Sequence, residues 1–307
     1  MVTFIIRRIL LCIPVLLGVT FIVFMMMHII PGDPAVIMAG EAARPEQIEQ
    51  MRYQLGLNDP VLTQYFRYLG NLLRGDMGNS IRSGVPVSQE LFEVRFWTTM
   101  QLAIFASIAS VLLGLMIGIV SVVWRRSFLD VVLMLIALMG LSIPNFLTGV
   151  LLMFFFAVNL GWLPVAGWGD PQHIIMPVIM LGVSGSAIIA RMTRASMMEV
   201  FNQDYIRTAY AKGASERIVI FRHALRNALI PVITVVGLQF GGLLSGAMLT
   251  ETIFAINGMG RVIIQSLNTR DFPLAQGAIL ICAAMFVLVN MIVDIAYRFV
   301  NKRIDVA

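Results

Sequence analysis

Residues 98–124 read TTMQLAIFASIASVLLGLMIGIVSVVW. The stretch contains no charged side chain, and it is longer than the roughly 20 residues that a helix needs to cross the hydrocarbon core of a bilayer. Within that core every backbone N–H and C=O group must find its partner inside the protein, which an α-helix achieves within the segment itself. The stretch therefore predicts a transmembrane helix.

Five further stretches of the chain have the same apolar character: Ile9–Ile30, Val131–Leu160, Ile174–Ala190, Ile230–Thr250 and Ala275–Tyr297. Of the 307 residues, 59% are hydrophobic and only 13% are charged, against about 25% charged in soluble domains. This composition predicts an all-α, polytopic membrane protein with six transmembrane helices. Val131–Leu160 is over-long for one span, and Pro144 interrupts it. We expect one kinked helix here rather than a helix followed by a re-entrant turn.

The positions of the basic residues predict the orientation of these spans. Arginines follow the second and fourth spans, and further basic residues precede the first span and follow the sixth. Most acidic residues lie at the other ends of the spans. Cytoplasmic loops carry an excess of Lys and Arg, so both termini are expected in the cytoplasm. The net charge of +5 is explained by this distribution, and nucleic acid is not expected as a partner. The first segment is expected to be a true helix, because its apolar run is longer than that of a signal peptide.

The chain divides on this basis into residues 1–30, with the first span, an extracytoplasmic cap at 31–97, and a core at 98–307. The cap has helical periodicity at Glu46–Leu55 and Leu62–Leu73, and it is expected to lie on the membrane surface. The core includes a cytoplasmic loop at 191–229.

The cytoplasmic loop predicts two short helices joined by a tight bend. Asp204 is a plausible N-cap for a helix over Tyr205–Lys212, Gly213 supplies the left-handed residue that ends it, and Ser215 caps a second helix that runs into Pro231. Small side chains surround the bend and would let another protein approach closely. Docking of a partner protein and attachment to anionic lipid both remain open from the residues alone.

Small residues spaced four apart predict close helix packing inside the membrane. The pairs are Gly114–Gly118, Gly237–Gly241 and Gly242–Gly246, and the two pairs in the fifth span predict a central position for that span. Asp294 is the one charge expected inside a span, satisfied by Arg298 four residues later. The candidate polar groups of a transport pathway are Gln101, Asn145, Gln239 and Asn290.

The sequence argues against an enzyme with its own energy source or catalytic site. A P-loop requires a lysine directly after a glycine, and neither Lys212 nor Lys302 follows one. Gly182–Gly185 resembles the Gly-x-Ser-Gly of intramembrane serine proteases, but no histidine falls within a neighbouring span to accept the proton of Ser184. The three histidines are scattered, so no metal site and no catalytic residue is predicted.

Several motifs, in order along nearly the whole chain, resemble one family. They are PGDP at 31–34, LGLNDP at 55–60, GDMGNS at 75–80, TRASM at 193–197, DYIRTAYAKGASERIVIFRHALRNALIP at 204–231 and TETIF at 250–254. The stretch at 204–231 resembles the "EAA" loop of importer-type ABC transporter permeases, especially the peptide/nickel permease family. Ala209 and Gly213 match the alanine and glycine of that motif. The chain departs from the family at Tyr210, where many members carry a basic residue, and at Ile256–Asn257, which replaces an aromatic–Pro pair.

The resemblance implies a permease subunit of an ATP-driven importer that moves di- or oligopeptides or a related small solute. It implies a second, related permease subunit, two ATPase subunits that bind ATP and Mg, and an extracytoplasmic solute-binding protein. The EAA loop would dock on an ATPase subunit through Asp204, Tyr205, Arg207, Thr208, Ala209, Ala211, Lys212, Gly213, Ala214 and Ser215. The location implied is the bacterial inner membrane, and no cofactor is expected in this chain.

Two alternatives stay open. Within the same family, the substrate could be nickel or another chelated metal. From a different class, the chain could be an ion-coupled secondary carrier, although such carriers usually hold several charges within their spans.

Overall fold

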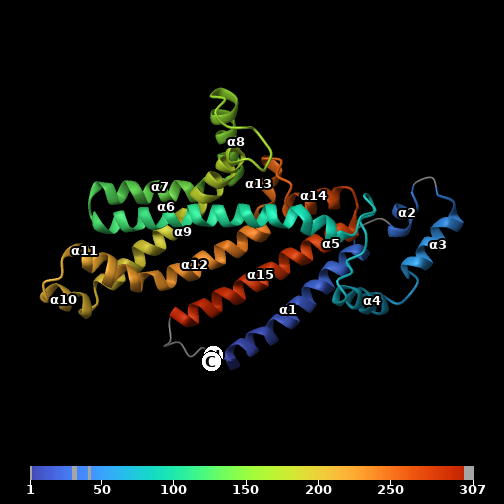
Figure 1. The fold of residues 1–307 in the computed structure, drawn as a ribbon, viewed down its shortest axis with the longest axis horizontal. Helices are drawn as coiled ribbons and strands as arrows, with labels where there is room; N and C mark the ends of the chain where they lie inside the picture. The colour runs from blue at the N-terminus through green and yellow to red at the C-terminus, as the bar shows by residue number, and fades with distance from the viewer. Residues whose placement is uncertain (1, 30–32, 41–42, 301–307) are drawn as a thin grey trace. The chain divides into compact units, whose positions relative to one another are not determined.

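The computed structural model describes residues 2–29, 33–40 and 43–300, and throughout these ranges the chain forms helices and turns (Figure 1). The one β-type pairing described is an isolated bridge between Asn79 and Pro86. The predicted all-α class is confirmed. Backbone contacts divide the chain into two compact units. The first comprises the chain up to Thr99 together with Asn257–Val287, and the second comprises Met100–Ile256 with the chain from Leu288 onward.

Five helical stretches are long and apolar enough to cross a membrane: Ile6–Ile29, Val87–Val123, Pro171–Phe201, Glu216–Leu244 and Phe272–Ile295. A sixth candidate is the pair of helices Phe128–Ser142 and Asn145–Asn159, which are bent by 98° at the break between them. The predicted total of six is therefore reached when this bent pair counts as one span.

The expectation of a single kinked helix over Val131–Leu160 is wrong. Ile143 adopts an extended conformation and ends α7 (Phe128–Ser142), and Pro144 is the N-cap of α8 (Asn145–Leu152). Proline disfavours helical geometry in the residue before it and cannot donate a backbone hydrogen bond, so both effects fall at this one point. A π-helical segment, η2 (Met153–Asn159), continues α8.

In the first unit, α4 packs on α1 through Tyr65. This unit contains α1 (Val2–Ile29), α2 (Pro34–Ala39), α3 (Pro45–Leu55), α4 (Val61–Leu73), α5 (Val87–Glu90), η1 (Leu91–Arg95), α14 (Met259–Asn268) and most of α15 (Phe272–Val300). The Tyr65 hydroxyl lies 2.9 Å from Thr20 Oγ1, and its ring meets Phe21 edge-on at 5.3 Å. The two cap helices predicted from periodicity are confirmed as α3 and α4.

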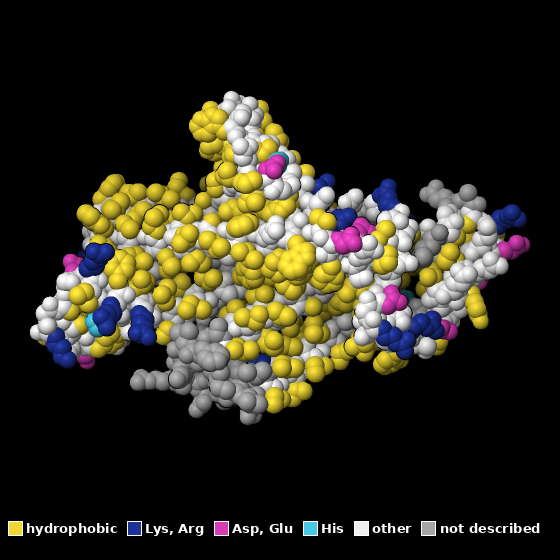
Figure 2. Space-filling model, viewed as in Figure 1, with side chains coloured by type: hydrophobic (Ala, Val, Ile, Leu, Met, Phe, Trp, Pro, Cys, Tyr) yellow, Lys and Arg dark blue, Asp and Glu magenta, His cyan; other side chains and the backbone are white. Residues whose placement is uncertain are grey.

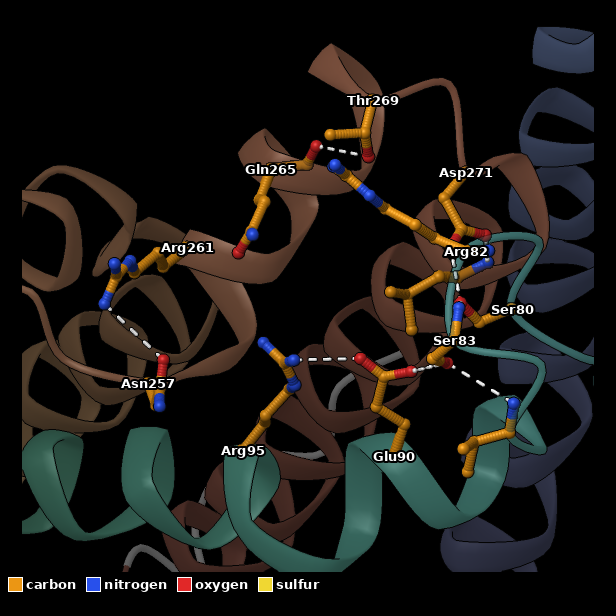
Figure 3. Close-up of polar contacts among 12 residues, drawn as sticks. Ser80, Arg82, Ser83, Glu90, Arg95, Asn257, Arg261, Gln265, Thr269 and Asp271 are labelled. Carbon is orange, nitrogen blue, oxygen red and sulfur yellow. Dashed lines mark hydrogen bonds and ion pairs between the residues drawn. The ribbon is translucent and has the colours of Figure 1, made fainter. Parts of the chain in front are cut away.

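Asp271 organises the loop that precedes α5 (Figure 3). It is 2% exposed, and its carboxylate accepts hydrogen bonds from the Ser80 hydroxyl and from the backbone N–H groups of Ile81 and Arg82. Glu90 accepts from Ser83 Oγ at 2.9 Å and from Arg95 Nη2 at 2.9 Å. These bonds hold the loop against the start of α15. The residues that form them line a cavity of about 150 Å³.

In the second unit, α9 (Pro171–Phe201) is the central helix. Most of α6 (Phe96–Val123) belongs to this unit, with α7, α8, η2, α10 (Asp204–Ala211), α11 (Glu216–Ile218), η3 (Val219–Ala224), α12 (Leu225–Gly246) and α13 (Met248–Ile253). Both α7 and α12 pack along α9 (Figure 1). In the most apolar part of α9, half of the residues are buried, against 22% in the most apolar part of the stretch that contains α12. Within the second unit, the central position therefore belongs to α9 and not to the predicted fifth span.

Glycines make the close approach between α6 and α9 possible. A Cβ atom at Gly114 would lie 2.6 Å from Ile189 Cβ, and one at Gly118 would lie 2.7 Å from Thr193 Cβ. These contacts confirm the packing role of that pair, and Gly237 likewise faces Val293 of α15. Gly242 does not follow the prediction, because a Cβ atom there would meet none of the described atoms within 4 Å.

Candidate coupling segment and polar sites

The predicted bend between the two short helices is present, and the helix before it begins one residue earlier than predicted. The N-cap of α10 is Gln203, so Asp204 is the first helical residue rather than the cap. Gly213 has φ +81°, the left-handed conformation that glycine adopts without steric cost. Its N–H donates to Tyr210 O at 2.9 Å and that of Ala214 to Ala209 O at 3.1 Å, which together form a Schellman motif.

The helix that follows the bend is continuous with a membrane-spanning helix. Ser215 holds the N-cap position of α11 in extended conformation. The helical backbone then passes through η3 into α12, and the stretch Glu216–Leu244 qualifies as one helix, with Pro231 inside it. The predicted run of the second helix into the fifth span is confirmed. The helix that follows the bend and α12 therefore form one continuous element.

An apolar cluster attaches α10 to the ends of three spans. Ile206 is only 1% exposed, and it shares the cluster with Val122 of α6, Met197 of α9 and Ala228 of α12. Ala209 and Ala214 also pack against this cluster, so these two predicted docking residues face inward. The Tyr205 hydroxyl accepts from Asn227 Nδ2 of α12 at 2.7 Å.

The opposite face of α10 is open. The exposed members of the predicted docking set are Asp204, Tyr205, Arg207, Thr208, Ala211, Lys212, Gly213 and Ser215. Tyr210, the departure from the family pattern, is 45% exposed on the same helix. Lys and Arg side chains gather at this end of the second unit (Figure 2), where Arg207, Lys212, Arg217, Arg222 and Arg226 are exposed. The segment thus combines an anchored inner face with a polar, basic outer face.

The four candidate pathway residues lie in different surroundings. Gln101 of α6 accepts from Trp168 Nε1 at 3.3 Å, and Gln239 of α12 donates to Gly185 O of α9 at 3.2 Å. Asn145 is exposed at the first turn of α8, and Asn290 is half-buried in α15. Helix-to-helix bonding accounts for Gln239, and the pathway role of all four stays a prediction.

A buried ion pair in the second unit was missed by the sequence reasoning. Asp130, near the start of α7, is 4% exposed and pairs with Arg194 of α9 at 2.8 Å. Asp294 is therefore not the only charge within the spans, and the side chain of Arg298, its expected partner, lies outside the described residues. The missed signal was the position of Arg194, which stands about two helical turns inside the observed end of α9 at Phe201 rather than beyond it.

Comparison with known proteins places the chain in a family. The family described as "Binding-protein-dependent transport system inner membrane component" matches residues 110–306, and the corresponding N-terminal family matches residues 1–103. The dipeptide transport system permease protein DppB of Alkalihalophilus pseudofirmus is 43% identical over 332 residues, covering 99% of each chain. The glutathione transport system permease protein GsiC of Salmonella paratyphi A is 43% identical over 304 residues, also covering 99% of each chain.

A solved structure supports the fold. The inward-facing MetNI methionine ABC transporter aligns with 67% of this chain and 94% of its own, at a TM-score of 0.56 and 18% identity. This likeness concerns the fold alone, whereas the family matches and the relatives extend over almost the whole sequence. The chain belongs to the family of inner-membrane components of binding-protein-dependent transport systems, the permease subunits of ABC importers.

Proposed function

We propose that this permease forms half of the transmembrane pathway of an ATP-driven importer and that the segment from α10 to α11 docks on an ATPase subunit. A second, related permease chain would form the other half. The observation that carries the proposal is the double-sided character of α10. Its inner face is held by Ile206 in a cluster shared with α6, α9 and α12, while its outer face is exposed and polar.

The geometry of the segment suits transmission of force. Ile206 and the Schellman motif at Gly213 limit bending of α10 relative to α11, and α11 continues into α12 without a break in the helix. A rigid element that is continuous with the spans moves them when it is displaced. Closure of an ATPase dimer would thus shift α9 and α12 together. ATP and Mg would be bound by the partner subunits, and this chain would hold no cofactor.

The proposed substrates are small peptides, namely dipeptides, oligopeptides or glutathione-like peptides. The names of the two full-length relatives, one a dipeptide and one a glutathione permease, support this class. A solute-binding protein on the extracytoplasmic side would deliver the substrate and supply most of the selectivity. Nickel or another metal chelate is the second candidate, on the resemblance to the peptide/nickel family.

The proposed location is the bacterial inner membrane with both termini in the cytoplasm. The exposed basic residues of α10, α11 and η3 support this orientation, because basic loops are retained on the cytoplasmic side. The cap helices α3 and α4 would then lie outside.

The experiment is to tag this chain, extract it gently from native membranes and identify the co-purifying chains by mass spectrometry. If the chain is an importer permease, we expect P-loop ATPase subunits and a second permease among the co-purifying chains. Reconstituted vesicles with the binding protein should then take up a labelled dipeptide or glutathione only when ATP is supplied. Uptake driven by an ion gradient without any ATPase would instead establish the secondary carrier, and uptake of a nickel chelate alone would establish the metal alternative.

A further inference from the structure

The Asp130–Arg194 ion pair joins three helices at a single point. Arg194 of α9 donates from Nε to Asp130 Oδ1 at 2.9 Å and from Nη2 to Oδ2 at 2.8 Å, a two-point contact with the carboxylate. The same Nε lies 3.0 Å from Ser121 Oγ of α6, and the Ser121 hydroxyl also donates to Asp130. One carboxylate of α7 is thereby bound to both α6 and α9.

The pair is arranged so that Asp130 does not tolerate loss of Arg194, whose own side chain is 34% exposed. Asp130 is almost fully desolvated, and the Arg126 backbone N–H, at 3.3 Å, completes its set of donors. A buried carboxylate left without its cation keeps the cost of desolvation and loses the compensating attraction. Asp130 therefore needs the two-point contact with Arg194, as expected of a fixed connection rather than of an adaptable surface contact.

The pair lies directly beside the cluster that anchors α10. Ser121 precedes Val122, and Arg194 stands one turn before Met197, and both of these neighbours are members of that cluster. Farther along the same two helices, α7 meets α9 through apolar side chains, with Ala137 facing Ala187 and Ala190 and Met134 packed beside them. A groove of about 530 Å³ runs beside the pair between α7 and α9. The ion pair is thus the strong connection between α7 and the coupling end of α9.

We infer that Asp130, Ser121 and Arg194 form a three-helix clamp that makes α6, α7 and α9 follow α10 as one body during transport. This inference rests on the proposed coupling role of α10. The clamp residues are positioning residues: they would contact neither substrate nor ATP. They would make α7 move together with α9 when α9 is displaced, so that force applied at α10 reaches the bent pair α7–α8.

The first test compares Arg194→Gln with Arg191→Gln in the purified complex. Arg191 is an exposed arginine on the same helix and forms no part of the clamp, so it controls for the loss of one positive charge. We expect Arg194→Gln to keep ATP hydrolysis while substrate moved per ATP falls about tenfold, a loss within the usual range of coupling energies. The charge-reversed double variant Asp130→Arg with Arg194→Asp should recover part of the loss. An unchanged ratio of transport to hydrolysis in Arg194→Gln would overturn the clamp.

A second test needs no substrate. Spin labels at Leu135→Cys on α7 and Lys212→Cys beyond α10, with Cys12 and Cys282 replaced by alanine, report the distance between the two elements. In the parent chain we expect one narrow distance distribution, and in Arg194→Gln a broader one, whereas Arg191→Gln should leave it narrow. Equal widths in all three contradict the clamp.

The two tests separate failure of the clamp from failure of the proposed function. If no ATPase subunit co-purifies with the chain, the coupling role is rejected. The width of the distance distribution would still test the clamp. If Arg194→Gln does not insert, Arg194→Lys keeps the charge but loses the two-point contact. It should give an intermediate loss and intermediate broadening, and parent-like values would reject the inference.

Discussion

Asp271 shows how one buried charge can fix a loop far away in the sequence. Its carboxylate accepts hydrogen bonds, in place of water, from the Ser80 hydroxyl and from two consecutive backbone N–H groups, those of Ile81 and Arg82. Such donors, once buried, are costly to leave without an acceptor. Sequence reasoning used Asp271 only as an acidic marker of topology, because its partners lie 189 to 191 residues away.

Asp271→Ala is expected to loosen the loop over residues 80–86 and to lower the free energy of unfolding of the first unit by about 3 kcal/mol. Limited proteolysis of the purified protein should then cut within this loop at a faster rate than in the parent chain. Asp76→Ala is the matched control, since Asp76 is exposed and accepts one hydrogen bond, from the Gly78 N–H at 2.8 Å. Equal cutting rates in the two variants would contradict the role given to Asp271.

Tyr68 of α4 gives the first unit a dependence on alkaline pH. Burial, and secondarily the neighbouring Tyr65, raise the pKa of the Tyr68 hydroxyl from 10.0 to about 12. Above pH 10 the unfolded chain loses this proton first, so it binds fewer protons than the folded chain, and the free energy of unfolding falls as pH rises towards 12. Thermal unfolding at pH 9 and pH 11 should show a loss of about 1 kcal/mol from this group.

The change Tyr68→Phe should remove that pH-dependent part. The Tyr68 hydroxyl has no hydrogen-bond partner among the described residues, so the substitution itself is expected to cost little at pH 9. Tyr53→Phe serves as control, because Tyr53 is 82% exposed. An identical pH dependence in the parent chain and in Tyr68→Phe would refute the assignment.

At the scale of elements, the bend between α10 and α11 depends on the backbone of Gly213 rather than on lack of space. A Cβ atom there would meet nothing within 4 Å, but φ is +81°. A β-branched residue in the left-handed region costs roughly 1–2 kcal/mol, whereas asparagine tolerates that region. We therefore expect Gly213→Val or Gly213→Pro to leave the protein inserted but to uncouple ATP hydrolysis from transport, and Gly213→Asn to retain most coupling.

The measurement is substrate-stimulated ATP hydrolysis alongside uptake in the same vesicles. Normal stimulation in Gly213→Val would argue against the coupling assignment. The comparison with asparagine separates backbone conformation from the size of the added side chain, because both substitutions place new atoms in the same open space.

The contact between α6 and α9 depends on space instead. A Cβ atom at Gly118 would lie 2.7 Å from Thr193 Cβ and 2.8 Å from the Ala190 carbonyl oxygen, so the helices would have to separate. Gly118→Val is expected to destabilise the folded protein by about 3 kcal/mol, the upper range for overpacking. The yield and melting temperature of the detergent-extracted chain should fall, while Gly242→Ala, where space is open, should change neither. Parent-like stability of Gly118→Val would show that α9 can shift without cost.

For the whole molecule, the bent pair α7–α8 decides the membrane topology. Five long helices alone would place the two termini on opposite sides, and a sixth crossing by the bent pair would place them on the same side. We expect the same side, the cytoplasm. A fluorescent protein that folds only in the cytoplasm and a phosphatase that is active only outside it, fused to each terminus in turn, provide the measurement. Phosphatase activity at one terminus alone would identify α7–α8 as a re-entrant pair.

Local signals in the sequence predict the membrane class, most of the helices and the bend between α10 and α11. These features depend on local signals: long runs without charge at 98–124, the glycine at 213, and periodicity that places α3 and α4 within a residue of their observed starts. Local signals are sufficient here because a helix satisfies its backbone within its own segment. The bend at Gly213 was predicted for the same reason, except that Asp204 lies inside α10 instead of capping it.

Three features depend instead on tertiary packing: which helix is central in the second unit, how far the chain turns at Pro144, and which charges meet. Gly242 and Gly118 have the same four-residue spacing, yet only Gly118 faces another helix closely, because spacing does not state what lies opposite. Asp130 and Arg194 are separated by 64 residues, and each alone has the pattern of an ordinary charge near a span end. Their pairing depends on the packing of α7 on α9, which is a property of the assembled bundle and of no single stretch of sequence.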